Sequence, residues 1–199
     1  LVVLALFTSM TSGALMQKIL RDRASVKLKS LLKKDQIFFG LEASDRDGLL
    51  KQMSVQAATK VSFEQEKIYE LLLKREDLDS TGLKDGIAMP HCRLPDLEEP
   101  KVFMGFCPDG VDFHSPDQSR SKVIFMIITN EKDFQSQLEI ISQIATLFQE
   151  RDNCFNILKC QTPTEVIAFI NSYQKSWEHY KYFWEKWNIW NHQYSDLKV

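Results

Sequence analysis

The sequence predicts an α/β domain over residues 43–172, built in three layers as a small sheet between helices. Two runs, KVFMGFC at 101–107 and KVIFMIIT at 122–129, are rich in β-branched and aromatic residues and predict strands. The second run is apolar almost throughout, which is typical of a strand covered on both faces. Apolar residues recur at helical spacing before and after these strands, so helices supply the covering layers.

Two helices are predicted before the strands. The first begins after Ser44 or Asp45, because either side chain can cap a helix N-terminus. The second is predicted to begin with a capping box, in which Ser62 is the cap and Gln65 follows three residues later. A turn-rich stretch then leads into the short apolar run IAMP at 87–90.

Three helices are predicted after the strands. Residues 133–150 carry apolar side chains at helical spacing, and a shorter helix is expected around 152–160. The last begins at Pro163, because proline is favoured at the first helical position. These helices complete the domain.

Composition excludes several classes of protein. Of 199 residues, 44% are hydrophobic and 26% charged, which argues against a disordered chain. The net charge of −2 gives no overall footprint for nucleic acid. Cys92, Cys107, Cys154 and Cys160 form no CxxC pair, so neither a disulfide framework nor a zinc ribbon is expected. Free thiols in a reducing compartment are the simplest interpretation.

The N-terminal segment, residues 1–17, contains no charged residue, and residues 18–34 hold seven basic residues and one acidic, a net +6. An apolar run followed by basic residues is typical of a membrane helix that ends in the cytoplasm. Because the run is short and starts at Leu1, we interpret it as the end of a transmembrane helix of a longer protein. The alternatives are a signal peptide, which lacks its preceding basic region here, and a buried core helix.

The two segments that flank the domain are amphipathic. Residues 18–42 are interpreted as a basic juxtamembrane connector, either a solvated helix or one held against anionic lipid headgroups. Residues 173–199 place Tyr173, Trp177, Tyr180, Trp184 and Trp187 at steps of three and four, on one helix face. Docking onto the domain or a second copy is the first interpretation of this tail, and an interfacial membrane helix is the other.

A candidate site lies between residues 71 and 94. His91 follows Pro90, where a strand is expected to end and a loop to begin. Arg75, Ser80 and Thr81 lie at the end of a helix and the start of a loop that contains Gly82 and Gly86. If that loop folds back over His91, a guanidinium, two hydroxyls and several backbone N–H groups are expected to converge on the imidazole. A neutral imidazole can attack a phosphoryl group, while a guanidinium and backbone amides stabilise the charge on its oxygens.

Other interpretations of His91 are simpler. A histidine in a loop is commonly an ordinary surface or hydrogen-bonded residue. A metal site at His91 and Cys92 is not expected, because adjacent ligands rarely face one ion and no further His or Cys lies at a useful spacing.

The run KRED-x-DSTGLKDGIAMPHCRL at 74–94 resembles the active-site signature of enzyme IIA of the fructose/mannitol type, including its nitrogen-regulatory relatives, in the phosphoenolpyruvate:sugar phosphotransferase system. The resemblance extends over roughly 44–172, through the VDFHSPD turn and the KVIFMIIT strand. It implies the α/β/α fold of enzyme IIA with a small mixed sheet. It also implies that no metal or organic cofactor is used.

The resemblance assigns roles by position. His91 would be phosphorylated by the phosphocarrier protein HPr, with Arg75 steadying the site and Ser80 and Thr81 matching the STG pair. In transport versions the phosphate then passes to a Cys of a IIB domain. Where the family usually has a second His, this chain has Gln137, which can donate a hydrogen bond but carries no charge. His114 lies in the turn after the first long strand and is treated as a loop residue.

Residues 1–15 resemble, more weakly, the end of the last membrane helix of bacterial cation:proton antiporters. Two functions follow. The domain is a phosphoryl carrier, or it is a regulatory module that controls an attached transporter through phosphorylation or HPr binding. A degenerate domain that only binds partners is the third possibility. In each, the domain is expected on the cytoplasmic face of a bacterial inner membrane.

Overall fold

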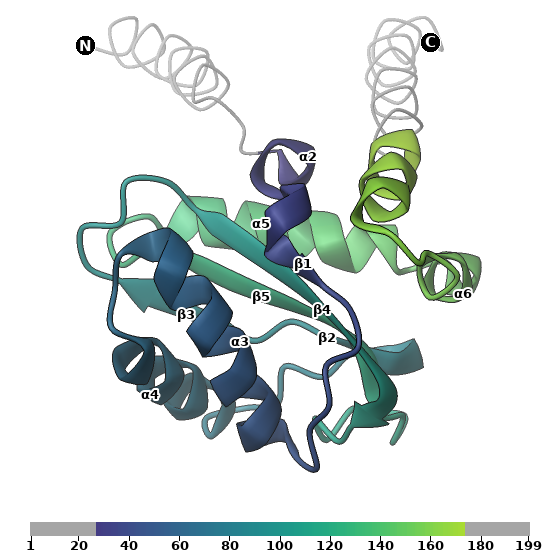
Figure 1. The fold of residues 1–199 in the computed structure, drawn as a ribbon, viewed down its shortest axis with the longest axis horizontal. Helices are drawn as coiled ribbons and strands as arrows, with labels where there is room; N and C mark the ends of the chain where they lie inside the picture. The colour runs from purple at the N-terminus through teal and green to yellow at the C-terminus, as the bar shows by residue number, and fades with distance from the viewer. Residues whose placement is uncertain (1–26, 174–199) are drawn as a thin grey trace, which may run out of the picture.

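The computed structural model describes residues 27–173, which form a mixed sheet with helices on both faces (Figure 1). The five strands of the sheet are β1 (Ile37–Phe38), β2 (Ile87–Ala88), β3 (His91–Leu94), β4 (Lys101–Val111) and β5 (Ser121–Asn130). Their order is β1-β4-β5-β2, and β3 also pairs with β5. The predicted three-layer α/β architecture is confirmed.

The sheet is built around one antiparallel pair, β4 and β5, with short parallel strands on its two edges. On one edge, β1 runs parallel to β4. On the other, β2 and β3 follow one another along β5, with Ile87 beside Val123 and His91 beside Ile127. Between them, the carbonyl of Pro90 accepts a hydrogen bond of 2.9 Å from the Ile127 amide. β2 and β3 therefore act as one edge strand that is interrupted at Pro90.

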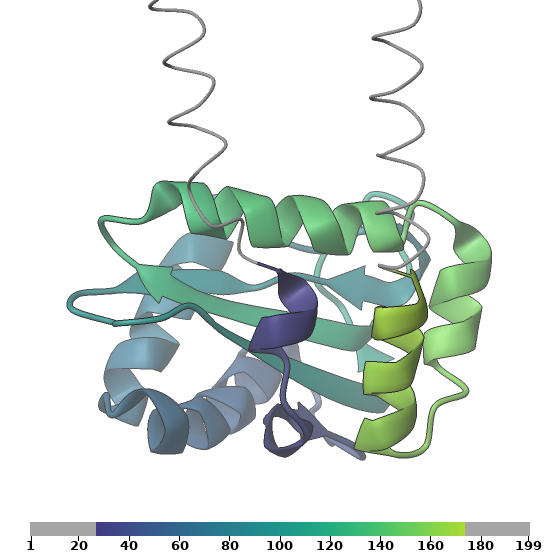
Figure 2. The same ribbon diagram turned by 90° about the horizontal axis from the view of Figure 1, so that it is seen from above.

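Helices cover both faces of this sheet, as the second view shows (Figure 2). They are α2 (Leu28–Leu31), α3 (Arg46–Val61), α4 (Gln65–Glu76), α5 (Phe134–Leu147), α6 (Arg151–Ile157) and a helix that includes residues 163–173; two 3-10 turns are η1 (Lys34–Gln36) and η2 (Lys84–Gly86). α3 and α4 pack on one face, and α2, α5, α6 and the last helix pack on the other.

Strand alternation divides the buried residues into two cores. In β5, Phe125 and Ile127 pack toward α5, whereas Ile124 and Met126 pack toward α3 and α4. All four side chains are fully buried. The prediction that this strand is covered on both faces is confirmed.

Helix α3 begins as predicted, but the predicted capping box of the next helix is wrong. The Asp45 carboxylate accepts a hydrogen bond of 2.8 Å from the Gly48 amide, so Asp45 rather than Ser44 caps α3. Ser62 has φ 55 and ends α3 in the left-handed conformation. A residue in that conformation closes a helix C-terminus and cannot also be the extended N-cap of the next. α4 instead begins at Gln65.

The domain also begins earlier than predicted. Leu28, Leu32 and Ile37 are buried in the α5-side core, and β1 forms an edge of the sheet. Residues 27–42 are therefore part of the fold and not of a connector that would reach from 18 to 42. The basic residues between these apolar positions lie on the exposed side, which is why the segment resembles a solvated amphipathic helix.

Helix α5 contacts both ends of the described chain. The Gln143 side chain accepts a hydrogen bond of 3.0 Å from the Leu28 amide, and the Tyr173 hydroxyl donates one of 3.1 Å to the Thr146 carbonyl. The predicted membrane helix at 1–17 and the aromatic tail after Tyr173 lie outside the described residues. Among residues 27–173, no helix is long and apolar enough to cross a membrane.

Replacing Ile37 with alanine tests whether β1 belongs to the folded domain. Because the side chain is buried in the core, we expect Ile37→Ala to lower the free energy of unfolding by about 2 to 5 kcal/mol. Urea unfolding followed by circular dichroism measures this change. Val55→Ala, at an exposed apolar position on α3, is the matched control. Equal effects of the two substitutions would mean that β1 is not part of the cooperative unit.

Candidate functional site

His91 is the first residue of β3, so it lies on a strand and not at the start of a loop as the sequence analysis expected. The strand resumes after the interruption at Pro90, because residues from His91 to Leu94 again pair with β5. Within β3, Cys92 and Leu94 point into the core under α3 and α4. His91 and Arg93 therefore point to the opposite face, toward α5.

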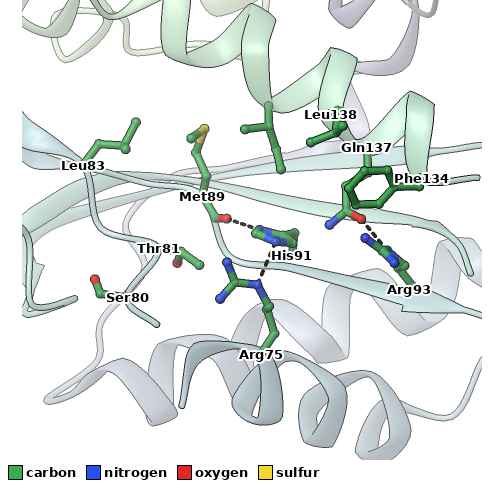
Figure 3. A pocket seen from close by; sticks show the side chains of 11 residues that line it. Arg75, Ser80, Thr81, Leu83, Met89, His91, Arg93, Phe134, Gln137 and Leu138 are labelled. Atoms are coloured by element: carbon green, nitrogen blue, oxygen red, sulfur yellow. Dashed lines mark hydrogen bonds between the residues drawn. The ribbon is translucent and has the colours of Figure 1, made fainter. Parts of the chain in front are cut away.

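Hydrogen bonds fix the tautomer of His91. Its Nδ1 lies 2.9 Å from the Met89 carbonyl oxygen, which can only accept, so Nδ1 carries the proton. Nε2 lies 3.0 Å from Nε of Arg75 and accepts a hydrogen bond from it. The lone pair of the neutral ring is thus on Nε2, the nitrogen that faces the pocket and Arg75 (Figure 3).

The surroundings keep this imidazole neutral. Burial lowers the pKa of His91 below its ordinary value of 6.5, because the charged form loses solvation. The positive charges of Arg75 and Arg93 lower the pKa further, and the Met89 carbonyl opposes them by stabilising the protonated ring. A neutral ring at neutral pH is the form that can act as a nucleophile.

Ser80 and Thr81 line the pocket, but their hydroxyl protons are used to hold the loop. The Thr81 hydroxyl and amide both donate to the buried carboxylate of Glu76, the amide over 2.9 Å. The Ser80 hydroxyl donates to the Phe113 carbonyl and accepts from the Gly82 amide. The prediction that these two hydroxyls converge on the imidazole is therefore wrong. These residues fix the loop beside His91.

Gly82 allows that loop to lie against residues 113–115. A Cβ at this position would lie 2.6 Å from the Ser115 hydroxyl oxygen and 2.8 Å from the Phe113 carbonyl oxygen. Any other residue would push the two segments apart. The glycine of the STG run is thus required by close packing.

Gln137 and Arg93 form a pair on the other side of His91. Gln137 is buried in the first turns of α5, and its Oε1 accepts a hydrogen bond from Nε of Arg93. The guanidinium carbon of Arg93 lies 4.7 Å from the ring centre of Phe134. Sequence reasoning overlooked Arg93, although the two-residue period of a strand places it on the same face as His91.

The pocket formed by these residues has a volume of about 390 Å³. It is lined by Arg75, Ser80, Thr81, Leu83, Met89, His91, Arg93, Phe134, Gln137, Leu138 and Ile141. Two of these side chains are guanidinium groups, and no carboxylate is among the described residues that line it. Such a lining favours an anion. His114, by contrast, is exposed in the loop after β4 and bonds locally to Asp112.

Cys92, beside His91, points away from the pocket. Burial raises the pKa of its thiol to about 12, so the thiolate that a metal ion requires is strongly disfavoured. Among residues 27–173, no three His, Cys, Asp or Glu side chains are close enough together to hold one metal ion.

A family model described as phosphoenolpyruvate-dependent sugar phosphotransferase system, EIIA 2, matches residues 30–173. The chain belongs to this family. Its fold is that of an EIIA-like phosphotransfer domain. The family match begins at residue 30, within α2, which agrees with the finding that residues 27–42 belong to the folded domain.

Two curated relatives share the match. The chain is 28% identical over 151 residues to the fructose-specific EIIABC component of Bacillus subtilis, covering 75% of this chain and 24% of that protein. It is 28% identical over 128 residues to the nitrogen regulatory protein of Pseudomonas aeruginosa, covering 64% and 83%. The chain thus spans about a quarter of the sugar-specific relative and most of the regulatory one.

Solved structures have the same fold. The nitrogen regulatory protein IIA-Ntr of Neisseria meningitidis matches with a TM-score of 0.69 and 24% identity, covering 72% of this chain and 98% of that one. The complex of enzyme IIAMTL and phosphorylated enzyme IIBMTL from Escherichia coli matches with a TM-score of 0.60 and 18% identity, covering 71% and 97%.

Titration of His91 tests the electrostatics of the pocket. In the folded full chain we expect an NMR titration midpoint below 6.5, rising when Arg75→Met removes a positive neighbour. A lowered folded pKa means that the unfolded state takes up the proton first as pH falls. The stability contributed by His91 is therefore complete above pH 6.5 and decreases below it. A midpoint at or above 6.5 would contradict this description of the site.

Proposed function

We propose that His91 is the phosphorylated residue of this domain and that its phosphoryl donor is HPr. The observation that carries the proposal is the state of the ring. Nδ1 is tied to the Met89 carbonyl as a donor, so Nε2 keeps its lone pair toward a pocket with two guanidiniums. Family membership supports the same chemistry.

The transfer is a displacement at phosphorus. Nε2 of His91 attacks, the bond from nitrogen to phosphorus forms, and the bond from phosphorus to the donor breaks, with its electron pair leaving on the donor. The ring becomes positively charged in the product. The Met89 carbonyl stabilises that charge through the proton that stays on Nδ1.

Arg75 has a part in both states of the ring. In the unphosphorylated domain its Nε donates to Nε2, which occupies the attacking lone pair, and its terminal nitrogen donates to the Asp79 carbonyl over 3.0 Å. The guanidinium leaves Nε2 when phosphate arrives and donates to the phosphoryl oxygens instead. Arg75 therefore orients the ring first and stabilises the product afterwards.

The phosphate then passes to a IIB domain or sets the activity of an attached transporter. The first route is supported by the structural similarity to the IIA partner of a phosphorylated IIB enzyme and by the relative named as an EIIABC component. A domain that only binds partners, with His91 unused, is not favoured, because the nucleophile and its cationic neighbours are all in place.

Phosphorylation of the full chain tests the assignment of His91. Incubated with phosphoenolpyruvate, enzyme I and HPr, the protein is expected to gain the mass of one acid-labile phosphate. His91→Ala should abolish the gain, because the hydroxyls of Ser80 and Thr81, which also line the pocket, are held in hydrogen bonds to other groups and would not form an acid-labile phosphate. His114→Ala, which changes an exposed loop histidine, should leave it intact. A gain that survives His91→Ala would refute the assignment.

The second route rests on the first 34 residues. An uncharged run at 1–17 and a net charge of +6 over 18–34 support attachment after the last membrane helix of a cation:proton antiporter-like protein. The domain would then lie on the cytoplasmic face of the bacterial inner membrane. There the charge of about −1.5 to −2 that phosphorylation adds can reorganise a contact with the transporter.

Vesicle flotation tests this attachment. The full chain is expected to float with vesicles that contain anionic phospholipid, because both the apolar run and the basic segment favour them. A chain that starts at residue 27, checked for folding by circular dichroism, should remain in the dense fraction. If both proteins stay in the dense fraction, membrane attachment through residues 1–26 is wrong.

A further inference from the structure

We propose that Arg93 is the second cation that binds the phosphoryl group on His91, and that Gln137 positions it for this role. The inference rests on the proposed phosphorylation of His91. It assigns the second positive charge of the pocket to a strand residue, at a site where the resemblance leads one to expect a histidine on α5.

The position of Arg93 on β3 brings it within reach of a phosphoryl group on His91. Residues two apart on a strand point to the same face, with Cα atoms about 6.6 Å apart. Both side chains line the same pocket. Arg75 reaches that pocket from the end of α4, so the two guanidiniums approach His91 from different sides (Figure 3).

No carboxylate among the described residues neutralises the charge of Arg93. Neither Arg75 nor Arg93 forms an ion pair with a carboxylate among residues 27–173, whereas Arg46 pairs with Asp47 and Asp77. A phosphoryl group on His91 presents three strongly accepting oxygens, and the planar fork of one guanidinium binds two of them. A second guanidinium can bind the third.

Gln137 and Phe134 hold the Arg93 side chain at the pocket. The Gln137 oxygen accepts from Nε, and the Phe134 ring lies against the guanidinium, so the terminal nitrogens are left for an anion. Gln137 itself is neutral and cannot supply the missing charge. Figure 3 shows its amide nitrogen on the side nearer His91, where it can add one further donor.

The first experiment measures the rate at which phosphorylated HPr transfers phosphate to the full chain. We expect Arg93→Gln to slow transfer about 10- to 100-fold, because hydrogen bonds to a charged group typically contribute a factor of this size. Arg93→Lys should recover part of the rate, because it keeps the charge but not the planar fork. Arg151→Gln, an exposed arginine on α6, is the matched control and should be within about 2-fold of the unchanged chain.

A second measurement tests, without HPr present, whether the charge of Arg93 acts on His91. By NMR titration, Arg93→Gln is expected to raise the pKa of His91, since a positive neighbour is removed. A titration midpoint that does not move would mean that the charge of Arg93 does not act on the ring, and it would overturn the proposed role. Unfolding curves of each variant confirm that it remains folded.

A double-substitution cycle tests the part played by Gln137. If Gln137 acts by holding Arg93, Gln137→Leu slows transfer in the unchanged chain but causes little further loss in the Arg93→Gln variant. Fully additive losses would overturn the positioning role of Gln137.

The outcomes separate this inference from the function on which it rests. If the unchanged chain gains phosphate and the transfer rate of Arg93→Gln is within about 2-fold of it, only the proposed role of Arg93 is overturned. An unchanged chain that gains no phosphate at all overturns both proposals.

Discussion

The hydrogen bond from Nδ1 of His91 to the Met89 carbonyl is the interaction on which the site depends. The edge strand is interrupted at Met89 and Pro90, between β2 and β3, and the Met89 carbonyl in this interruption lies against the imidazole two residues later. The chain pairs with β5 again from His91, so the ring is attached to a rigid strand. One break in a strand thus fixes both the place of His91 and the ring nitrogen that carries its lone pair.

In the loop between α4 and β2, the donor groups of Ser80 and Thr81 are used to hold the loop in place and are not left for a phosphate. The buried carboxylate of Glu76 takes both donors of Thr81, and Ser80 bonds to a neighbouring carbonyl. Because the hydroxyls of Ser80 and Thr81 already donate hydrogen bonds within the protein, the groups in the pocket that remain to bind an anion are the two arginines. The loop contributes shape and rigidity, which preorganise the arginines and the ring.

Much of the fold could be predicted from local patterns. The runs of β-branched and aromatic residues in β4 and β5 and the cap at Asp45 are short-range signals, and each was confirmed. Ser62 was misread because the same sequence can close one helix or open the next, and only the packing of α3 against α4 decides between them. Residues 27–42 were misread because their burial comes from β4 and α5, which lie far along the chain.

The sequence predicted which residues surround His91 but not how their side chains are oriented or bonded. His91 and Arg75 do meet, as the spacing across the loop suggested. The hydroxyls of Thr81 and Ser80 instead donate to Glu76 and to the Phe113 carbonyl. These acceptors come from outside the STG run, so the motif alone does not predict the direction of the hydroxyls. Arg93 was missed because a loop was expected to begin at His91; since His91 instead begins β3, strand alternation places Arg93 on the same face.

Helix α5 connects the pocket with both ends of the described chain. Its first turns hold Gln137, its middle accepts the Leu28 amide and its last turn accepts the Tyr173 hydroxyl. The helix has 14 residues and is therefore only about 21 Å long. A force or displacement applied at Leu28 or Tyr173 therefore acts on the same short helix that carries Gln137, so the two ends of the described domain and the surroundings of His91 are coupled through one rigid element.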